Sequence, residues 1–319
     1  MGKIRVGVVG VGYLGQFHAE KYANMEGVEL VGVVDIDAAR SKEIAHRYGT
    51  QAFLRHAHLF DKVQAVSIAV PTLLHFPIAR DFFSQGIDVL LEKPISQTLE
   101  EADELIGLAE SKALVFQVGH LERFNGALTA CKGIVQSPVY IETHRLSPFP
   151  GRGTDVNVIL DLMIHDIDIL LSLVDSKVER IEATGIPVLT PHSDIANAWI
   201  EFENGCRANL TVSRVSTEKT RRMLIFLSNG TLSIDYLAQK GSFTRKGAQD
   251  ETPKIATDEI PVTKVDSLEA EILAFLQSVR HRTGARVSGR DGKRALEVAL
   301  RIIRKIDEGG LKNAHLPVA

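Results

Sequence analysis

The stretch that decides the fold is residues 4–15, IRVGVVGVGYLG, near the start of a chain of 319 residues. Its first half is rich in β-branched residues and predicts a buried strand from Ile4 to Val9. The pattern G-x-G-x-x-G follows at residues 10–15, and helical periodicity continues from Leu14 to Met25. A strand, a glycine-rich turn and a helix in this order are typical of a site for the pyrophosphate of a dinucleotide.

Each glycine of the turn has a mechanical task. Gly10 allows the tight bend, Gly12 lets the backbone approach a pyrophosphate, and Gly15 permits close packing of the helix on the strand. Tyr13 and Leu14 stand at the helix N-terminus, which faces the anion. Because glycines at this spacing also occur in ordinary strand-to-helix turns, the prediction of a cofactor site rests on the whole context.

An acid at the end of the second predicted strand supports the same site. Asp35 follows the strand Leu30 to Val34, where a carboxylate can bond the 2'-hydroxyl of the adenosine ribose. With Ile36 beside it and no adjacent arginine, we expect NAD rather than NADP, although Arg40, a helical turn away, argues for NADP. A cap for the next helix is the alternative role of Asp35.

The order of the expected elements divides the chain in two. Short strands first alternate with helices such as Ala38 to Tyr48, which predicts an α/β domain with a doubly wound parallel sheet. Closely spaced strands after a long helix at Val158 to Val174 predict an α+β domain with a large, mainly antiparallel open sheet. We expect these domains at residues 1–121 and 122–319, and the C-terminal helices can pack back on the first domain. The segment Lys240 to Pro261 fits no clear element.

Polar residues follow the later strands of the first domain, at the edge where open α/β sheets bind ligands. Lys93 lies in the segment Glu92-Lys93-Pro94, where an ammonium beside a nicotinamide can bond the reacting oxygen and share in its proton transfer. A solvated lysine is the alternative. Thr72 and His75 follow another strand end and can line the cofactor cleft, unless they only form a turn and start a helix. The other cofactor-binding candidates at these ends are Val70, Pro71 and Glu92.

The long helix of the second domain carries an acid and a base on one face. Asp161 and His165 are four residues apart, so the carboxylate can orient the imidazole. Histidine has the near-neutral pKa that suits removal of a hydroxyl proton while a hydride leaves the same carbon. An ordinary ion pair on the helix surface is the alternative.

Composition excludes several classes of function. Lys plus Arg number 37 and Asp plus Glu 40, a net charge of -3, so no basic field attracts a nucleic acid. Cys131 and Cys206 fit a reducing compartment, and no group of histidines has metal-ligand spacing. The apolar stretch Val156 to Val174 carries too many charges for a membrane span, and residues 1–15 do not form a signal peptide. We therefore expect a cytoplasmic protein with no metal and no nucleic-acid or membrane partner.

These motifs together resemble those of the glucose-fructose oxidoreductase, inositol dehydrogenase and rhizopine-catabolism family, Gfo/Idh/MocA. The resemblance spans nearly the whole chain and rests on the glycine turn with Asp35, Pro71-Thr72 with His75, Glu92-Lys93-Pro94, and residues 161–165, DLMIH. It implies a Rossmann domain followed by a domain whose open sheet mediates homodimer or homotetramer contacts. It further implies NAD-dependent oxidation or reduction of sugar-like substrates, with Lys93, Asp161 and His165 as catalytic residues.

A further segment, His120 to Asn125 (HLERFN), resembles the part that enters the substrate cleft in family members acting on nucleotide-activated amino sugars. The leading candidate substrate is therefore UDP-N-acetylglucosamine, oxidised at its 3-hydroxyl. On this hypothesis Arg123 pairs with a phosphate, and His120, Asn125 and Asn157 contact the substrate. An inositol or a free aldose is the alternative substrate, and Arg123 would then be a cofactor contact or a structural stack with its aromatic neighbour. A regulatory NAD-binding protein without turnover is the alternative of another class.

Overall fold

The computed structural model describes residues 2–149, 156–247 and 254–309. They form two compact units. The residues up to Phe124, together with Val265–Leu296, form the first, and Asn125–Lys264, together with the residues from Glu297 onward, form the second. The division between residues 121 and 122 stays a prediction about folding domains, because compactness does not test independent folding.

A parallel sheet is the centre of the first unit, as the sequence predicted. Its strands are ordered β3-β2-β1-β4-β5-β6, and every neighbouring pair is parallel. The strands are β1 (Ile4–Val9), β2 (Val28–Val34), β3 (Gln51–Phe53), β4 (Ala65–Ile68), β5 (Asp88–Glu92) and β6 (Phe116–Gly119). The strand order reverses between β1 and β4, which is where a doubly wound sheet opens a crevice for a ligand.

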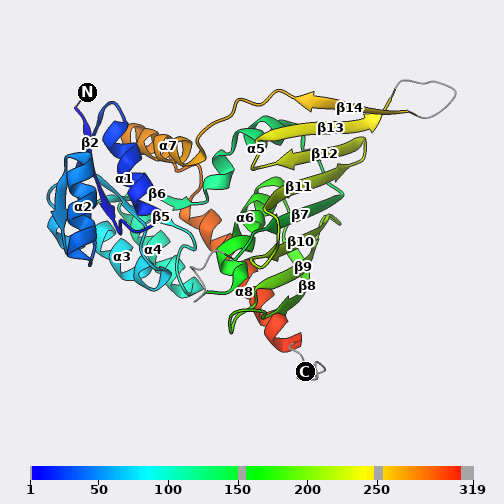
Figure 1. Ribbon diagram of the computed structural model, residues 1–319, viewed down its shortest axis with the longest axis horizontal. Coiled ribbons are helices and arrows are strands. Elements are labelled where there is room, and N and C mark those ends of the chain that lie inside the picture. The colour runs from blue at the N-terminus through cyan, green and yellow to red at the C-terminus, as the bar shows by residue number, and fades with distance from the viewer. Residues whose placement is uncertain (1, 150–155, 248–253, 310–319) are drawn as a thin grey trace. The chain divides into compact units, whose positions relative to one another are not determined.

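Helices cover both faces of this sheet (Figure 1). They are α1 (Gly15–Asn24), α2 (Ala38–Tyr48), α3 (His75–Ser84), α4 (Leu99–Ser111) and α7 (Ser267–His281), with short turns η1 (His56–Leu59), η2 (Thr72–Leu74) and η3 (Leu121–Phe124). Buried Tyr22 of α1 and Phe275 of α7 belong to one apolar cluster with Val6 and Val8 of β1. This cluster fixes α1, and with it the helix N-terminus that follows the glycine turn.

The second unit contains a large sheet ordered β14-β13-β12-β11-β7-β10-β9-β8. Among the described strands of this sheet, only β7 and β10 pair in parallel, and all other neighbours are antiparallel. The expected, mainly antiparallel sheet is therefore confirmed. The strands are β7 (Tyr140–Leu146), β8 (Val178–Ile186), β9 (Ile195–Phe202), β10 (Arg207–Ser213), β11 (Thr220–Leu227), β12 (Gly230–Asp235), β13 (Lys240–Lys246) and β14 (Ile255–Ile260).

Helices lie against one face of this sheet (Figure 1). They are α5 (Gly126–Cys131), the short turn η4 (Lys132–Ile134), the π-helix η5 (Ile159–Met163), α6 (Ile164–Leu173) and the later part of α8 (Gly289–Gly309). Strand β9 shows the consequence, since Ala198 and Ile200 are buried while Asn197 and Trp199 on the other face are only half-buried. Among the described residues, no helix covers that second face, which we call the open face.

Three features of the second unit differ from the sequence-based expectation. The helix predicted at Val158 to Val174 begins with a π-helical turn before α6. The segment Lys240 to Pro261, which fitted no element, contains β13 and β14. Strand β7 was not predicted, because its polar and charged residues, YIETHRL, mask its alternation. Over the described ranges, no helix combines the length and the apolar character that crossing a membrane requires.

Candidate active site

The glycine turn after β1 has the geometry that the sequence predicted. Gly10 has a φ of 81°, and a Cβ there would lie 2.6 Å from the carbonyl oxygen of Ala69. A Cβ on Gly15 would collide with the carbonyl oxygen of Gly10. By contrast, a Cβ on Gly12 would meet no atom within 4 Å. Gly10 and Gly15 are therefore required by the fold itself, whereas Gly12 leaves space beside the turn for a ligand.

Asp35 holds the same turn from the end of β2. Its Oδ2 accepts a hydrogen bond from the backbone N–H of Val11 at 2.9 Å, and its Oδ1 accepts one from Asp37 at 3.0 Å. Asp37, rather than Asp35, caps α2, because its Oδ1 accepts from the N–H groups of Ala39 and Arg40. The alternative role of Asp35 as a helix cap is therefore wrong.

Arg40 also contacts the turn. Its Nε donates to the carbonyl of Val11 at 2.9 Å, and its Nη1 lies 2.9 Å from a carboxylate oxygen of Glu43. Exposed apolar side chains follow the neighbouring strand ends, with Tyr13 at 59%, Ile36 at 90% and Leu73 at 60% exposure. Such a combination of apolar surface and convergent polar groups at a strand edge is typical of a cofactor crevice.

His75 connects two strand ends beneath the crevice. The side chain is buried, with Nδ1 2.7 Å from the carbonyl oxygen of Pro94 and Nε2 2.9 Å from that of Val70. Burial lowers the pKa of His75, while the two carbonyls act to raise it. The histidine thus ties the loop that carries Lys93 to the end of β4. Direct contact of Thr72 or His75 with a cofactor stays a prediction.

The backbone of Lys93 is bonded by a buried pair, His18 and Glu92, that the sequence did not predict. Nε2 of His18 on α1 lies 3.1 Å from Oε1 of Glu92, and both side chains are buried. Oε2 of Glu92 accepts a hydrogen bond from the N–H of Lys93 at 3.3 Å. The position of His18 on the first helical turn after the glycines could have indicated a role near the site. Nothing in the neighbouring sequence indicated that Glu92 is its partner.

The second unit carries the predicted acid and base at the junction of η5 and α6. Asp161 lies in the π-helix and His165 near the start of α6. π-Helical turns occur frequently at functional sites, because they shift side chains relative to a regular helix. Asn157 caps this segment, since its Oδ1 accepts from the N–H of Ile159 at 3.1 Å. The side chain of Asn157 therefore fixes the start of the helical segment that carries Asp161 and His165.

Two buried ion pairs, which the sequence did not reveal, hold this helix. Arg145 of β7 binds Asp166 through two hydrogen bonds of 2.9 and 2.8 Å, directly after His165 in the chain. Arg214 lies 2.7 Å from Asp194 and donates to the carbonyl of Val156 at 2.8 Å. Paired buried charges of this kind fix geometry when their hydrogen bonds are complete.

The segment after β6 holds the remaining predicted residues. Asn125 is buried, and its amide accepts from the N–H of Ala127 at 3.0 Å and donates to the carbonyl of Tyr236 at 3.1 Å. His120 is buried as well, while Arg123 is partly exposed with Nη2 3.5 Å from Asp291. Their contacts with a substrate stay predictions. Within the described residues, no cluster of three or more His, Cys, Asp and Glu could hold a metal ion.

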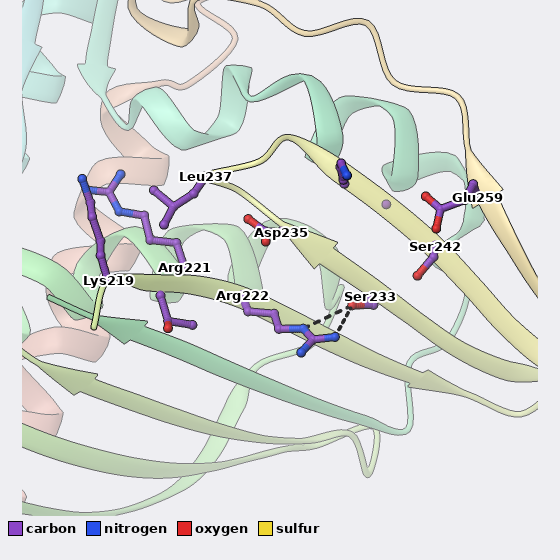
Figure 2. A pocket seen from close by; sticks show the side chains of 11 residues that line it. Lys219, Arg221, Arg222, Ser233, Asp235, Leu237, Ser242 and Glu259 are labelled. Atoms are coloured by element: carbon purple, nitrogen blue, oxygen red, sulfur yellow. Dashed lines mark hydrogen bonds between the residues drawn. The ribbon is translucent and has the colours of Figure 1, made fainter. Parts of the chain in front are cut away.

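A separate hollow of about 400 Å³ lies on the strands β11 to β14 of the second unit (Figure 2). It is lined by cations and acids together, namely Lys219, Arg221, Arg222, Lys240, Asp235 and Glu259. Nε and Nη2 of Arg222 lie 3.4 and 3.2 Å from Ser233 Oγ. Neither Asp161 nor His165 lines this hollow, so it is distinct from the candidate catalytic helix.

Comparison with known proteins decides the family. Residues 4–120 match the family model described as "Oxidoreductase family, NAD-binding Rossmann fold", GFO_IDH_MocA, and residues 132–233 match the "GFO/IDH/MocA C-terminal domain". The chain is 38% identical over 302 residues to UDP-N-acetylglucosamine 3-dehydrogenase of Acidithiobacillus ferrooxidans, covering 94% of this chain and 96% of that protein. The chain belongs to the Gfo/Idh/MocA family.

Relatives in this Gfo/Idh/MocA family extend the comparison. A solved structure of the Acidithiobacillus ferrooxidans enzyme superposes with a TM-score of 0.92 at 37% identity, covering 97% of this chain and 99% of that one. Inositol 2-dehydrogenase of Rubrobacter xylanophilus is 31% identical over 207 residues, 62% of this chain and 59% of that protein. The scyllo-inositol dehydrogenase of Lactobacillus casei, solved with NAD(H) and scyllo-inositol, shares the fold at a TM-score of 0.82 and 20% identity, covering 96% and 98%.

Membership of Gfo/Idh/MocA confirms the principal predictions from the sequence. The protein is an NAD-dependent oxidoreductase that acts on a CH–OH group of a sugar-like substrate. The structure shows that Asp35 bonds the glycine turn, and the contact of both with the dinucleotide stays a prediction. An NAD-binding regulator without turnover does not fit these comparisons.

Proposed function

We propose that this enzyme oxidises the 3-hydroxyl of UDP-N-acetylglucosamine and transfers the hydride to NAD. The observation that carries the proposal is the 38% identity to an enzyme of that name over nearly the whole of both chains. Identity that spans the cofactor unit and the second unit alike supports a shared substrate, because fold alone does not decide substrate within a family.

The proposed roles follow from the chemistry of the oxidation. The C–H bond breaks and its electron pair leaves as hydride to the nicotinamide, while the hydroxyl proton must go to a base. We assign the proton to His165, the polarisation of the reacting oxygen to Lys93, and the orientation of the imidazole to Asp161. Lys93 and His165 can exchange the first two roles, and we place His120, Arg123, Asn125 and Asn157 around the substrate.

A substrate panel tests the proposal. Purified enzyme with NAD is offered UDP-N-acetylglucosamine, other UDP-sugars, free aldoses and inositols, and NADH formation is followed by its absorbance. We expect turnover of UDP-N-acetylglucosamine by the wild type, and turnover lower by about 10²- to 10⁴-fold in Lys93→Ala, the control enzyme. The position of oxidation is then read by NMR of the product. Turnover of free polyols without any turnover of UDP-sugars would overturn the substrate and leave the dehydrogenase assignment standing.

An inositol substrate is the second candidate. The favouring observation is the 31% identity to inositol 2-dehydrogenase of Rubrobacter xylanophilus, which covers 62% of this chain. The same panel separates the two candidates, because an enzyme for inositol should turn over inositols, which carry neither a diphosphate nor a uridine, and should not turn over UDP-sugars.

We also propose a homodimer or homotetramer formed through the open face. Tyr140, Trp199 and Phe226 stack there across three strands, with ring centroids 5.8 and 5.4 Å apart. The hollow in Figure 2 adds cations and acids to the same sheet, so two copies related by a two-fold axis can pair opposite charges reciprocally. The net charge of -3 supports the absence of a nucleic-acid partner, and the free, buried Cys131 and Cys206 support a cytoplasmic protein.

A further inference from the structure

The carboxylate of Glu92 joins a side chain of α1 to the backbone of Lys93. Its Oε1 lies 3.1 Å from Nε2 of His18, and its Oε2 accepts from the N–H of Lys93 at 3.3 Å. The residue is only 5% exposed. Both oxygens therefore bond groups of the protein, one on each side of the carboxylate, and the bonds lie in the interior of the first unit.

The position of His18 is fixed by the packing of α1. Tyr22, one turn further along the helix, is fully buried in the apolar cluster with β1, and its hydroxyl lies 2.8 Å from Ser67 Oγ of β4. The helix begins at Gly15, directly after the glycine turn. One packed helix thus connects the turn that we expect to receive the cofactor to the strand end that carries Lys93.

The contacts of His18 decide which group donates to the other. Its Nδ1 is buried and, within the described ranges, has no hydrogen-bond partner. A proton on Nδ1 would be a buried donor without an acceptor, which proteins avoid more strictly than an unfilled lone pair. Nε2 therefore carries the proton and donates to Glu92. The histidine thereby stabilises the carboxylate that accepts from the N–H of Lys93.

The sheet leaves room for this carboxylate on the neighbouring strand. Gly119 of β6 is the register partner of Glu92 in β5. A Cβ on Gly119 would lie 2.9 Å from the carboxyl carbon of Glu92, closer than Cβ atoms approach other atoms in proteins. Because the carboxyl group is the end of a flexible side chain, an added methyl group would displace it. Gly119→Ala therefore moves the carboxylate without removing any polar group.

We propose that His18 and Glu92 are positioning residues, which set the place of Lys93 for the proton transfer. Glu92 fixes the backbone from which the lysine side chain projects, and His18 fixes Glu92 relative to the glycine turn. A misplacement of about 1 Å can cost about 10²-fold in rate, so the pair should act on turnover rather than on affinity. This inference rests on the proposed function, from which it takes the role of Lys93.

The test compares turnover of UDP-N-acetylglucosamine with NAD in wild type, Gly119→Ala, His18→Leu and His18→Gln. We expect kcat to fall by about 10-fold in Gly119→Ala and by about 10- to 100-fold in His18→Leu, with KM and the Kd of NAD near wild type. His18→Gln should restore most of kcat, because its amide can donate to Glu92 as Nε2 does. Gly107→Ala is the matched control, since Gly107 is exposed on α4 and a Cβ there meets no atom within 4 Å. It should keep the wild-type kcat.

A double-mutant cycle determines whether Gly119 acts through Glu92. Glu92→Ala removes the carboxyl group that the added methyl group would displace, so Gly119→Ala should have no further effect on kcat in that variant. Losses of rate that simply multiply would overturn the proposed route. Hydrogen exchange of the Lys93 amide is a reading independent of turnover. It should be faster in Gly119→Ala and His18→Leu than in wild type, and unchanged exchange would contradict the inference.

The remaining outcomes separate this inference from the proposed function. Wild-type kcat in both Gly119→Ala and His18→Leu, beside a loss of turnover in Lys93→Ala, would overturn the inference and leave the proposed function intact. A lowered thermal midpoint and weaker NAD binding in His18→Leu, without rescue by His18→Gln, would indicate a structural role and overturn it as well. Full turnover in Lys93→Ala, or none of UDP-N-acetylglucosamine by the wild type, would instead overturn the proposed function, and the inference with it.

Discussion

The carboxylate of Asp35 accepts a hydrogen bond from the backbone N–H of Val11, 2.9 Å away, in the middle of the glycine turn. The residue that we expect to bond the adenosine ribose therefore also fixes the glycine turn that we expect to receive the pyrophosphate. A change at Asp35 should alter both cofactor choice and the order of the turn.

We predict that Asp35→Ser shifts the enzyme toward NADP. Serine keeps a hydrogen-bond acceptor but removes the charge that repels a 2'-phosphate, and Arg40 beside Val11 is placed to receive that phosphate. The ratio of kcat/KM for NADP over NAD should rise by about 10-fold or more, equivalent to one lost charge interaction. Asp37→Ser is the control, since serine also caps a helix. An unchanged ratio in Asp35→Ser would contradict the assignment.

Two glycine variants should fail in different ways. Gly15→Ala places a Cβ against the carbonyl of Gly10, so it should lower the thermal midpoint and the yield of folded protein. Gly12→Ala meets no protein atom within 4 Å, so it should keep the midpoint and weaken NAD binding. Calorimetry and a fluorescence titration separate these effects. Equal stability loss in both variants would refute the different roles of the two glycines.

The proposed proton transfer predicts the behaviour of Lys93→Ala and His165→Ala. Positioned acid-base groups contribute about 10² to 10⁴ in rate, so each variant should lose turnover by that factor while its Kd for NAD stays near wild type. His192→Ala, an exposed histidine elsewhere in the second unit, serves as the control. Full turnover in both variants would rule out the assigned roles.

Asp194 should make stability depend on pH. Burial alone would raise the pKa of Asp194, but hydrogen bonds from the N–H groups of Leu189 and Thr190 and from Arg214 lower it well below its ordinary value. A lowered folded pKa contributes stability above the unfolded value of about 3.8 and loses it as pH falls further. Asp194→Asn should therefore reduce the free energy of unfolding by about 3–5 kcal/mol at pH 7. In urea titrations the difference from wild type should shrink in acid, and a pH-independent difference would contradict this account.

If the open face forms the contact between copies of the chain, we expect Trp199→Glu to prevent oligomerisation. A charge among the stacked rings of Tyr140, Trp199 and Phe226 should prevent a second copy from covering them, so light scattering should report monomers. Trp199→Phe keeps an aromatic ring and should keep the oligomer. A wild type that is already monomeric at micromolar concentration would contradict the proposal itself.

The elements of the first unit could be predicted from short stretches of sequence, because the residues that start, end and bend each element lie next to it in the chain. Helix α2 has the predicted bounds, Ala38 to Tyr48, since Asp37 caps its start and Gly49 adopts the left-handed conformation at its end. The glycine turn likewise depends on residues within one strand, one turn and one helix. The contact of Asp35 with the cofactor stays a prediction, which rests on a spacing from that turn that a single helix and strand set.

The features that sequence reasoning missed depend on partners far along the chain. Arg145 in β7 is buried because Asp166, 21 positions later, pairs with it, so the strand does not show the apolar alternation of a half-buried strand. His18 and Glu92 are 74 positions apart, and Arg123 and Arg286 are 163 apart. No pattern in the neighbouring sequence predicts such pairs, because the two residues meet only when the sheet and its helices pack.

The eight-stranded sheet ends in β14 on one side and β8 on the other, and both outer strands are rich in exposed charge. Asp258 and Glu259 lie on β14, and Glu179, Arg180 and Glu182 lie on β8. An outer strand leaves backbone groups that a foreign chain can pair with, and charges deter that pairing. Ile255, 81% exposed on β14, and Ile186, 48% exposed on β8, are apolar exceptions. These charges should therefore protect the protein from aggregation during synthesis, when neighbouring nascent chains are most concentrated.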